Sequence, residues 1–345
     1  MSSNDDAVPL ARLGRSTLVP ALICAAVCVS FMQAGFLTVL FLVPLGICCA
    51  AFGANAAWLS SILAALGNGV LSAGLSLFYG IKLANAGLDS LYFLILTFGF
   101  TWIVAGSPPS LPPIRTLWRF IGSAAAGACA FLGMIFATGK DESFVTLLRS
   151  QIDALSSMFI SSAGADAAQQ AFLERLLTPD RIIDMLTSIA LRGGALVSIS
   201  CLFFFSLQAA FFLVRLFRRN RYKTAGGLAF FHAPGRTIWI VIMCLPLIVL
   251  FQYIPFKFIE IVLWNILTTC VIMYLAQGCG IVLFALARRP RPVISRLFFG
   301  IAVIFLMFSP GINLLIIGIL VLLGIAENWL PLRKKVVDRE ERNQL

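Results

Sequence analysis

Polar side chains inside long apolar runs are the residues of this 345-residue chain best placed to do chemistry. A polar group is costly in hydrocarbon, so one retained there marks a ligand or ion pathway or a hydrogen bond between helices. These side chains are Gln33, Asn68, Gln208, Glu260, Asn265, Gln277 and Asn313. Three of them lie in one apolar run, at 258–287, which is therefore the predicted ligand-binding segment.

Gln277 in this run is followed by Gly278, Cys279 and Gly280. Two glycines beside an amide allow either a close helix contact or a local break that exposes backbone carbonyls to a ligand. We therefore predict that Glu260, Asn265, Gln277, Gly278 and Gly280 contribute to binding a small molecule.

Structural alternatives exist for the same residues. Asn265 and Gln277 are twelve positions apart, so they differ by about 120° around an ideal helix and do not share one face. Each amide could instead bond a neighbouring helix. Glu260 follows Lys257 by three residues, so an ion pair at the membrane interface would also explain it.

The sequence carries none of the common catalytic motifs. It has no H-E-x-x-H, G-x-S-x-G or G-x-x-x-x-G-K-[ST] pattern, so we predict a protein that is not an enzyme and that takes any primary energy from a partner. Its nine cysteines all lie in apolar stretches, and its one histidine, His232, lies in a basic loop. No metal site, disulfide framework or cofactor is predicted, and the cysteines are interpreted as small packing residues.

The solvent of this chain must be lipid. Hydrophobic residues make up 60% and charged residues only 12% of it, against about 25% charge in soluble proteins. Ten apolar runs approach the roughly 20 residues that a membrane helix needs. They fall at about 17–33, 36–54, 57–79, 91–106, 116–138, 191–217, 237–252, 258–287, 294–309 and 311–330. The predicted fold is an all-α polytopic bundle of about 8–10 membrane helices, in contact with the lipid bilayer.

Charge predicts the orientation of this bundle. If every run crosses the membrane, 19 of the 26 Lys and Arg residues lie on the side of the N-terminus. By the positive-inside rule both termini are then cytoplasmic, in a bacterial inner membrane. If either pair of runs, 17–54 or 57–106, did not cross the membrane, the predicted orientation of the runs that follow would be unchanged. The net charge of +11 lies in short loops at helix ends, so nucleic acid is not an expected partner.

A polar insertion at 139–190 interrupts the apolar pattern. Apolar residues recur at helical spacing over 144–159, a second short helix is expected at 172–177, and Thr178, Pro179 and Asp180 form a helix-start signal. We predict a small helical cap on the outer face, lying on the membrane or over a central cavity, with a simple connector as the alternative. The predicted domains are membrane helices at 1–138, this insertion, membrane helices at 191–335 and a charged tail at 336–345.

The last third of the chain resembles a known family. An aromatic helix start at 237–239, then Asn265, then Tyr274-Leu275-Ala276-Gln277-Gly278 and a closing Leu323–Trp329 carry the likeness. The pattern resembles the YybS-like family of bacterial polytopic membrane proteins, whose function is unknown, over about 230–335. Ala-Gln-Gly stands here where the family has Leu-Gln-Gly. The family is distantly similar to the S-components of energy-coupling-factor transporters. That likeness implies capture of a ligand in a helical bundle and docking, through Ala21 and Ala25, on a membrane partner or an ATPase.

Two functions follow as hypotheses. The first is binding or transport of a small solute, with energy supplied by a partner. The second is a scaffold or regulator that recruits cytoplasmic partners through two basic segments. One is 215–223, with Arg215, Arg218 and Arg219, and the other is 333–345. Transport of a lipid or envelope precursor beneath the outer cap is a third hypothesis.

Overall fold

The computed structural model describes residues 17–79, 83–105, 113–162, 177–217, 231–254, 257–287, 312–330 and 332–333. Within these ranges every regular element is helical, which confirms the predicted all-α fold. Five helices are long and apolar enough to cross a membrane: Ala54–Phe78, Ala86–Ala105, Arg115–Thr138, Pro179–Val214 and Lys257–Leu286. The chain is therefore a polytopic membrane protein. The apolar run predicted at 294–309 lies outside the described residues.

Contacts divide the chain into two units, which we describe separately. The first comprises Met1–Ser107 and Arg119–Arg221, and the second comprises Pro108–Trp118 and Tyr222–Leu345. The segment 191–217, which was grouped with the C-terminal helices from sequence, belongs to the first of these contact-based units.

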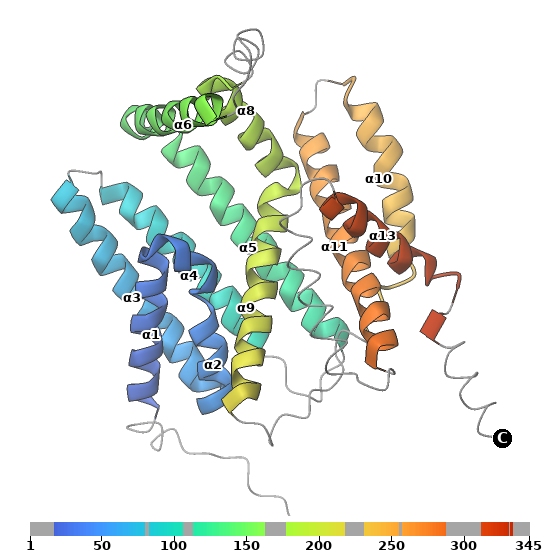
Figure 1. Ribbon diagram of the computed structural model, residues 1–345, viewed down its shortest axis with the longest axis horizontal. Coiled ribbons are helices and arrows are strands. Elements are labelled where there is room, and N and C mark those ends of the chain that lie inside the picture. The colour runs from blue at the N-terminus through green and yellow to red at the C-terminus, as the bar shows by residue number, and fades with distance from the viewer. Residues whose placement is uncertain are drawn as a thin grey trace, which may run out of the picture. The chain divides into compact units, whose positions relative to one another are not determined.

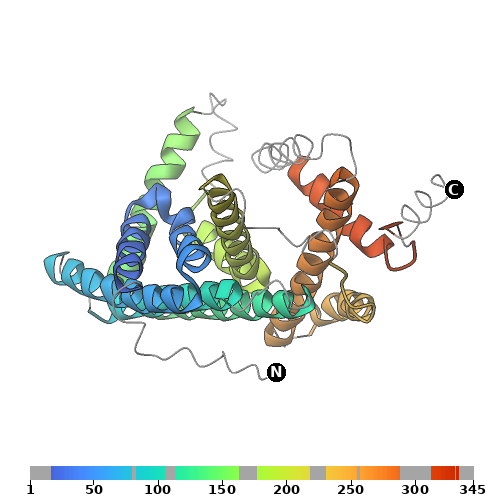
Figure 2. The ribbon, with the colours of Figure 1, turned by 90° about the horizontal axis from the view of Figure 1, so that it is seen from below.

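The first unit packs its membrane helices in two layers (Figure 2). One layer contains α3 (Ala54–Tyr79), α4 (Leu83–Ala105) and α5 (Pro113–Thr138, counted here from Arg119). The other contains α1 (Leu18–Gln33), α2 (Val43–Phe52) and α9 (Ala195–Phe217). Small residues let these helices approach closely, since a Cβ on Gly46 of α2 would lie 2.6 Å from the Cβ of Ala210 on α9. Aromatic rings fill the space between layers, with the centroids of Phe41 and Phe93 5.3 Å apart.

Helices α1 and α2 form a hairpin that enters the bundle and returns on one side. Its tip is the 3₁₀ segment η2 (Gly35–Leu40). The ten residues of α2 are about 15 Å long, half of the roughly 30 Å hydrocarbon layer. Both hairpin ends lie at the same end of the first unit (Figure 1), so the hairpin does not change the orientation of the helices that follow.

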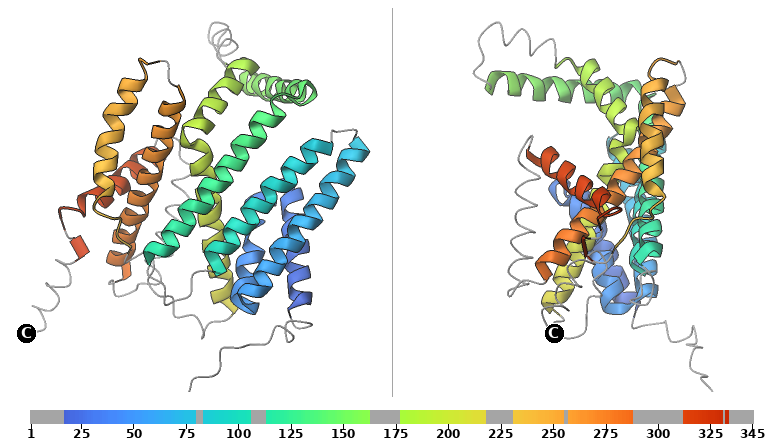
Figure 3. Two further views of the ribbon diagram at one scale, coloured as in Figure 1. Left: turned by 180° about the vertical axis from the view of Figure 1, so that it is seen from behind. Right: turned by 90° about the vertical axis from the view of Figure 1, so that its right-hand side faces the viewer.

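The polar insertion begins with α6 (Glu142–Ser162), which runs across the direction of α5 and α9 (Figure 3). The short helix predicted at 172–177 lies outside the described residues, except for Leu177. The predicted start at Thr178 is confirmed: Thr178 is the N-cap of α8 (Pro179–Ile189), with Pro179 and Asp180 in its first turn.

The insertion does not end at a loop. A π-helical segment, η3 (Ala190–Gly194), joins α8 to α9. The chain kinks inside it, where Gly193 has a φ of 109° that only glycine adopts readily. The outer segment and the membrane helix are thus one kinked continuous element.

The second unit contains α10 (Thr237–Phe251), α11 (Lys257–Ala287) and α13 (Ile312–Ala326). Helices α10 and α11 share an apolar core built around Cys244, Ile248, Leu263 and Leu267. Helices α11 and α13 meet backbone to backbone: a Cβ on Gly278 would overlap the carbonyl of Leu320, and one on Gly324 would overlap the carbonyl of Tyr274. Of the two sequence interpretations of Gly278, close helix contact is the one observed.

Candidate functional site

The hairpin tip places irregular backbone beside the apolar helices of the first unit. Backbone carbonyls in such a turn lack helix partners and need donors from elsewhere in the protein. The Thr38 hydroxyl donates to the Gly35 carbonyl at 2.6 Å and can reach the Met32 carbonyl at 3.2 Å. Ser206 of α9 donates to the Val39 carbonyl at 3.4 Å. Two hydroxyl groups thus bond the carbonyls of the turn.

A chain of polar side chains begins at this tip. Gln33, the last residue of α1, donates from Nε2 to Oδ1 of Asn68 on α3 at 3.0 Å. Asn68 then donates from Nδ2 to Oδ2 of Asp89 on α4 at 3.3 Å, and the Ser72 hydroxyl donates to the same oxygen at 2.9 Å. We call these four residues the tip cluster.

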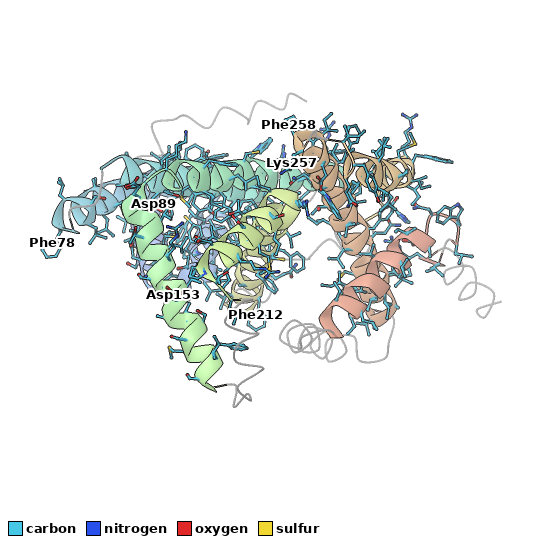
Figure 4. The ribbon with its side chains drawn as sticks, turned by 90° about the horizontal axis from the view of Figure 1, so that it is seen from above. Phe78, Asp89, Asp153, Phe212, Lys257 and Phe258 are labelled. Carbon is cyan, nitrogen blue, oxygen red and sulfur yellow. The ribbon has the colours of Figure 1, made fainter. Side chains whose placement is uncertain are left out.

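The residues of the tip cluster on α3 and α4 lie more than one turn inside the ends of those helices. Asn68 precedes the end of α3 at Tyr79 by eleven residues, or about 16 Å along the helix. Asp89 follows the start of α4 at Leu83 by six residues, or about 9 Å. Asn68 is fully buried and Ser72 is 9% exposed. Figure 4 looks down on this end of the unit and labels Asp89.

Electrostatics at the tip cluster favour positive charge. Asp89 is a carboxylate whose described partners are an amide and a hydroxyl, with no lysine or arginine among them. The C-terminal end of α1, at Gln33, adds the negative end of a helix dipole. A cation or a donor group of a ligand would complement both.

A second polar cluster lies in the second unit and is organised differently. The side chain of Gln277 accepts from the backbone N–H of Ala233 at 2.8 Å and donates to Glu327 Oε2 at 3.0 Å. Arg333 donates from Nε to Glu327 Oε1 at 2.6 Å and from an Nη to the carbonyl of Phe231 at 2.7 Å. This Gln277–Glu327–Arg333 cluster ties together α11, the turn after α13 and the irregular segment at 231–234.

The charges of this cluster compensate each other. Glu327 and Arg333 are 5% and 6% exposed. Burial alone would raise the pKa of Glu327, but hydrogen bonds from Arg333 and Gln277 outweigh burial and hold that pKa below its ordinary value. A buried, paired and fully bonded carboxylate is suited to holding structure together and offers little to a ligand.

The predicted ligand-binding residues are spread along α11. Glu260 is buried, at 7% exposed, seventeen residues before Gln277, which is about 26 Å along the helix. Asn265 donates to the carbonyl of Ile261 in its own helix at 2.9 Å. Gln277 and Gly278 lie at the crossing with α13, and Gly280 is buried two residues further on. The structure does not bring Glu260, Asn265 and Gln277 together, and their role in binding stays a prediction.

The structure describes only some of the predicted docking residues. Ala21 and Ala25 are 0% and 4% exposed, on the face of α1 that packs inside the unit, so docking through them would require the hairpin to separate from its neighbours. The side chain of Arg215 and all of Arg218 and Arg219 lie outside the described residues. Docking through these residues also stays a prediction.

Four cysteines lie on the two helices of the hairpin. Cys24 and Cys28 lie on α1, and Cys48 and Cys49 lie on α2. The Cys24 and Cys48 thiols are hydrogen-bonded. In the described part of the chain, no group of three or more His, Cys, Asp or Glu side chains is arranged to hold a metal ion.

Sequence reasoning missed two acidic residues that the structure makes central. Asp89 precedes the apolar run at 91–106 and so was not counted as a membrane residue, although α4 begins at Leu83. Glu327 lies just after α13 and was not among the polar residues singled out from the apolar runs. The clue for Asp89 was available, because no proline interrupts the stretch from Leu83 to Leu91 and a helix could therefore begin before the apolar run.

Comparison with known proteins gives no match to a family model, a curated protein or a solved structure.

Proposed function

We propose that this membrane protein binds or transports a small polar solute that carries a positive charge, and that the tip cluster is the binding site. The observation that supports this most is the hydrogen-bonded chain from Gln33 through Asn68 to Asp89, at the tip of a hairpin that ends inside the bundle. Ionisable residues inside a membrane commonly belong to solute or ion pathways.

The hairpin itself supports the proposal. Transporters often form their sites from discontinuous helices that end near the middle of the membrane, because irregular backbone is tolerated only where protein or a cavity surrounds it. Here α1 ends at Gln33, next to Asp89's partner Asn68. A carboxylate and a helix C-terminus favour a cation over an anion.

The test is ligand-dependent stabilisation of the purified protein in lipid nanodiscs. The panel comprises monovalent inorganic cations, primary ammonium and guanidinium compounds, neutral polar metabolites and organic anions. A ligand at 100 times its Kd should stabilise the protein by about 2.7 kcal/mol. We expect stabilisation by at least one cation class and not by anions.

Two matched variants assign the effect to the site. Asp89→Asn should lose the stabilisation, while Asp153→Asn, which removes an exposed carboxylate on α6, should retain it. Absence of any stabilising cation, or an unchanged response in Asp89→Asn, would refute the proposal. Uptake of the identified solute into proteoliposomes then separates transport from binding alone.

Cellular placement and family remain parts of this proposal. The charge distribution supports an inner bacterial membrane with both termini in the cytoplasm. The motif around Gln277 supports kinship with the YybS-like proteins. The scaffold hypothesis receives less support from the segment at 333–345, because Arg333 is buried against Glu327.

A further inference from the structure

The insertion helix α6 presents one apolar and one polar face. At 100° per residue, Leu148, Ile152 and Leu155 fall within an arc of about 60°, while Arg149, Asp153 and Ser157 occupy the other side. This face is not covered along its second half, where Leu155 is 67% exposed. Met158, which borders the face about 60° from Leu155 on the side away from Arg149, is 69% exposed.

The chain fixes the level at which α6 lies. Only the turn Gly139–Asp141 separates the end of spanning helix α5 from the start of α6, and the N–H of Asp141 bonds the carbonyl of Thr138 at 2.9 Å. At the other end of the insertion, α8 runs through the kink at Gly193 directly into spanning helix α9. Both attachments are thus ends of membrane helices on one face of the first unit.

The direction of α6 is also restrained. It runs across α5 and α9 and extends away from the helical layers (Figures 3 and 4). Arg149 of α6 pairs with Asp180 of α8, with an Nη of Arg149 2.8 Å from Oδ1 of Asp180. This exposed pair links α6 to the segment that leads into α9.

An amphipathic helix at the level of the ends of spanning helices can place an exposed apolar face against the boundary of the acyl chains. We propose that α6 is an interfacial helix whose Leu155 and Met158 side chains insert into the outer acyl-chain boundary of the bilayer. The charged residues of α6 in the described part are Glu142, Arg149 and Asp153, a net charge of −1. Burial of apolar surface, and not attraction to anionic headgroups, therefore drives the contact. This inference is independent of the proposed solute site.

The experiment is photo-crosslinking of the full chain in nanodiscs. A benzophenone amino acid is incorporated at Leu155 or, as a replicate in case that variant does not fold, at Met158. Ser157, which lies about 160° from Leu155 around the helix, is the matched control. Val70, 76% exposed on spanning helix α3, is the positive control.

We expect lipid adducts at Leu155, Met158 and Val70 and at least fivefold fewer at Ser157. The yield should be the same in zwitterionic and in anionic nanodiscs. Adducts to this chain, to a second copy or to another protein at Leu155 and Met158 would overturn the proposal. Equal lipid labelling at Leu155 and Ser157, or labelling that requires anionic lipid, would overturn it as well.

Discussion

Arg333 donates two hydrogen bonds to the carboxylate of Glu327, six residues earlier in the chain, at 2.6 and 2.5 Å. The same carboxylate accepts from Gln277, fifty residues earlier, so one buried acid joins α11 to the turn that follows α13. Because both charges are almost fully buried, each depends on the other.

Removing one member of this pair should destabilise the second unit strongly. Arg333→Met leaves a buried carboxylate uncompensated, which costs about 3–5 kcal/mol. We expect a lower midpoint of thermal unfolding in nanodiscs. The double variant Glu327→Gln/Arg333→Met should recover part of that loss, because no charge is then stranded. A double variant less stable than both single variants would contradict this account.

Low pH should weaken the contact between Glu327 and Arg333. The pKa of Glu327 is lower in the folded protein than in the unfolded chain, so its stabilising contribution is complete above the ordinary glutamate pKa of about 4.3. That contribution is lost as the pH falls through the lower, folded value. The unfolding midpoint of the wild type should therefore drop towards that of Glu327→Gln between about pH 5 and pH 3. A constant difference between the two proteins across this range would show that Glu327 does not titrate as described.

The crossing of α11 and α13 should tolerate no added methyl group. Gly278→Ala and Gly324→Ala place a Cβ against backbone carbonyls that cannot move aside. Each substitution should therefore lower the stability of the protein by about 1–3 kcal/mol or more, the range typical of overpacking. Gly318→Ala is the control, since nothing lies within 4 Å of its added Cβ. The measurement is resistance to denaturation by sodium dodecyl sulfate, and similar losses in all three variants would count against a close crossing.

The stability of the hairpin tip should depend on the Thr38 hydroxyl. Thr38→Val keeps the shape of the side chain but removes its hydrogen bonds to the Gly35 and Met32 carbonyls, which should cost about 1–3 kcal/mol. Thr38→Ser retains the hydroxyl and should stay within about 1 kcal/mol of the wild type. Amide hydrogen exchange in the peptide that covers η2 should rise in Thr38→Val only; equal exchange in both variants would rule out this role.

Much of the fold could be predicted from sequence because hydrophobic length and helix-start signals are local properties. The amphipathic segment that became α6 and the start of α8 at Thr178 followed from residue spacing alone. The short hairpin did not, because a run of apolar residues such as 36–54 has the same composition whether it crosses the membrane or turns inside it. The turn depends on Ser206, whose position relative to Val39 only the folded chain defines.

The candidate site was harder to predict, since pairing between distant residues decides what a polar group does. Gln277 looked suited to a ligand, yet it bonds Ala233 and Glu327. Asn68 was recognised as an unusual membrane residue, but its link to Asp89 required knowing that α4 starts before the apolar run. Spacing along one helix could show that Asn265 and Gln277 point in different directions. It could not show which residues of other segments lie opposite them.

The bond from Ser206 to the Val39 carbonyl spans 167 residues, and it sets an order of assembly during synthesis. The ribosome delivers α1 and α2 long before α9 exists, and α2 is too short to be retained in the bilayer as an independent segment. The hairpin can adopt its final form only after α9 has entered the membrane and brought Ser206 and Ala210 beside it. In a nascent chain arrested before residue 195, Ser206 and Ala210 are missing, so the hairpin should not reach its final form.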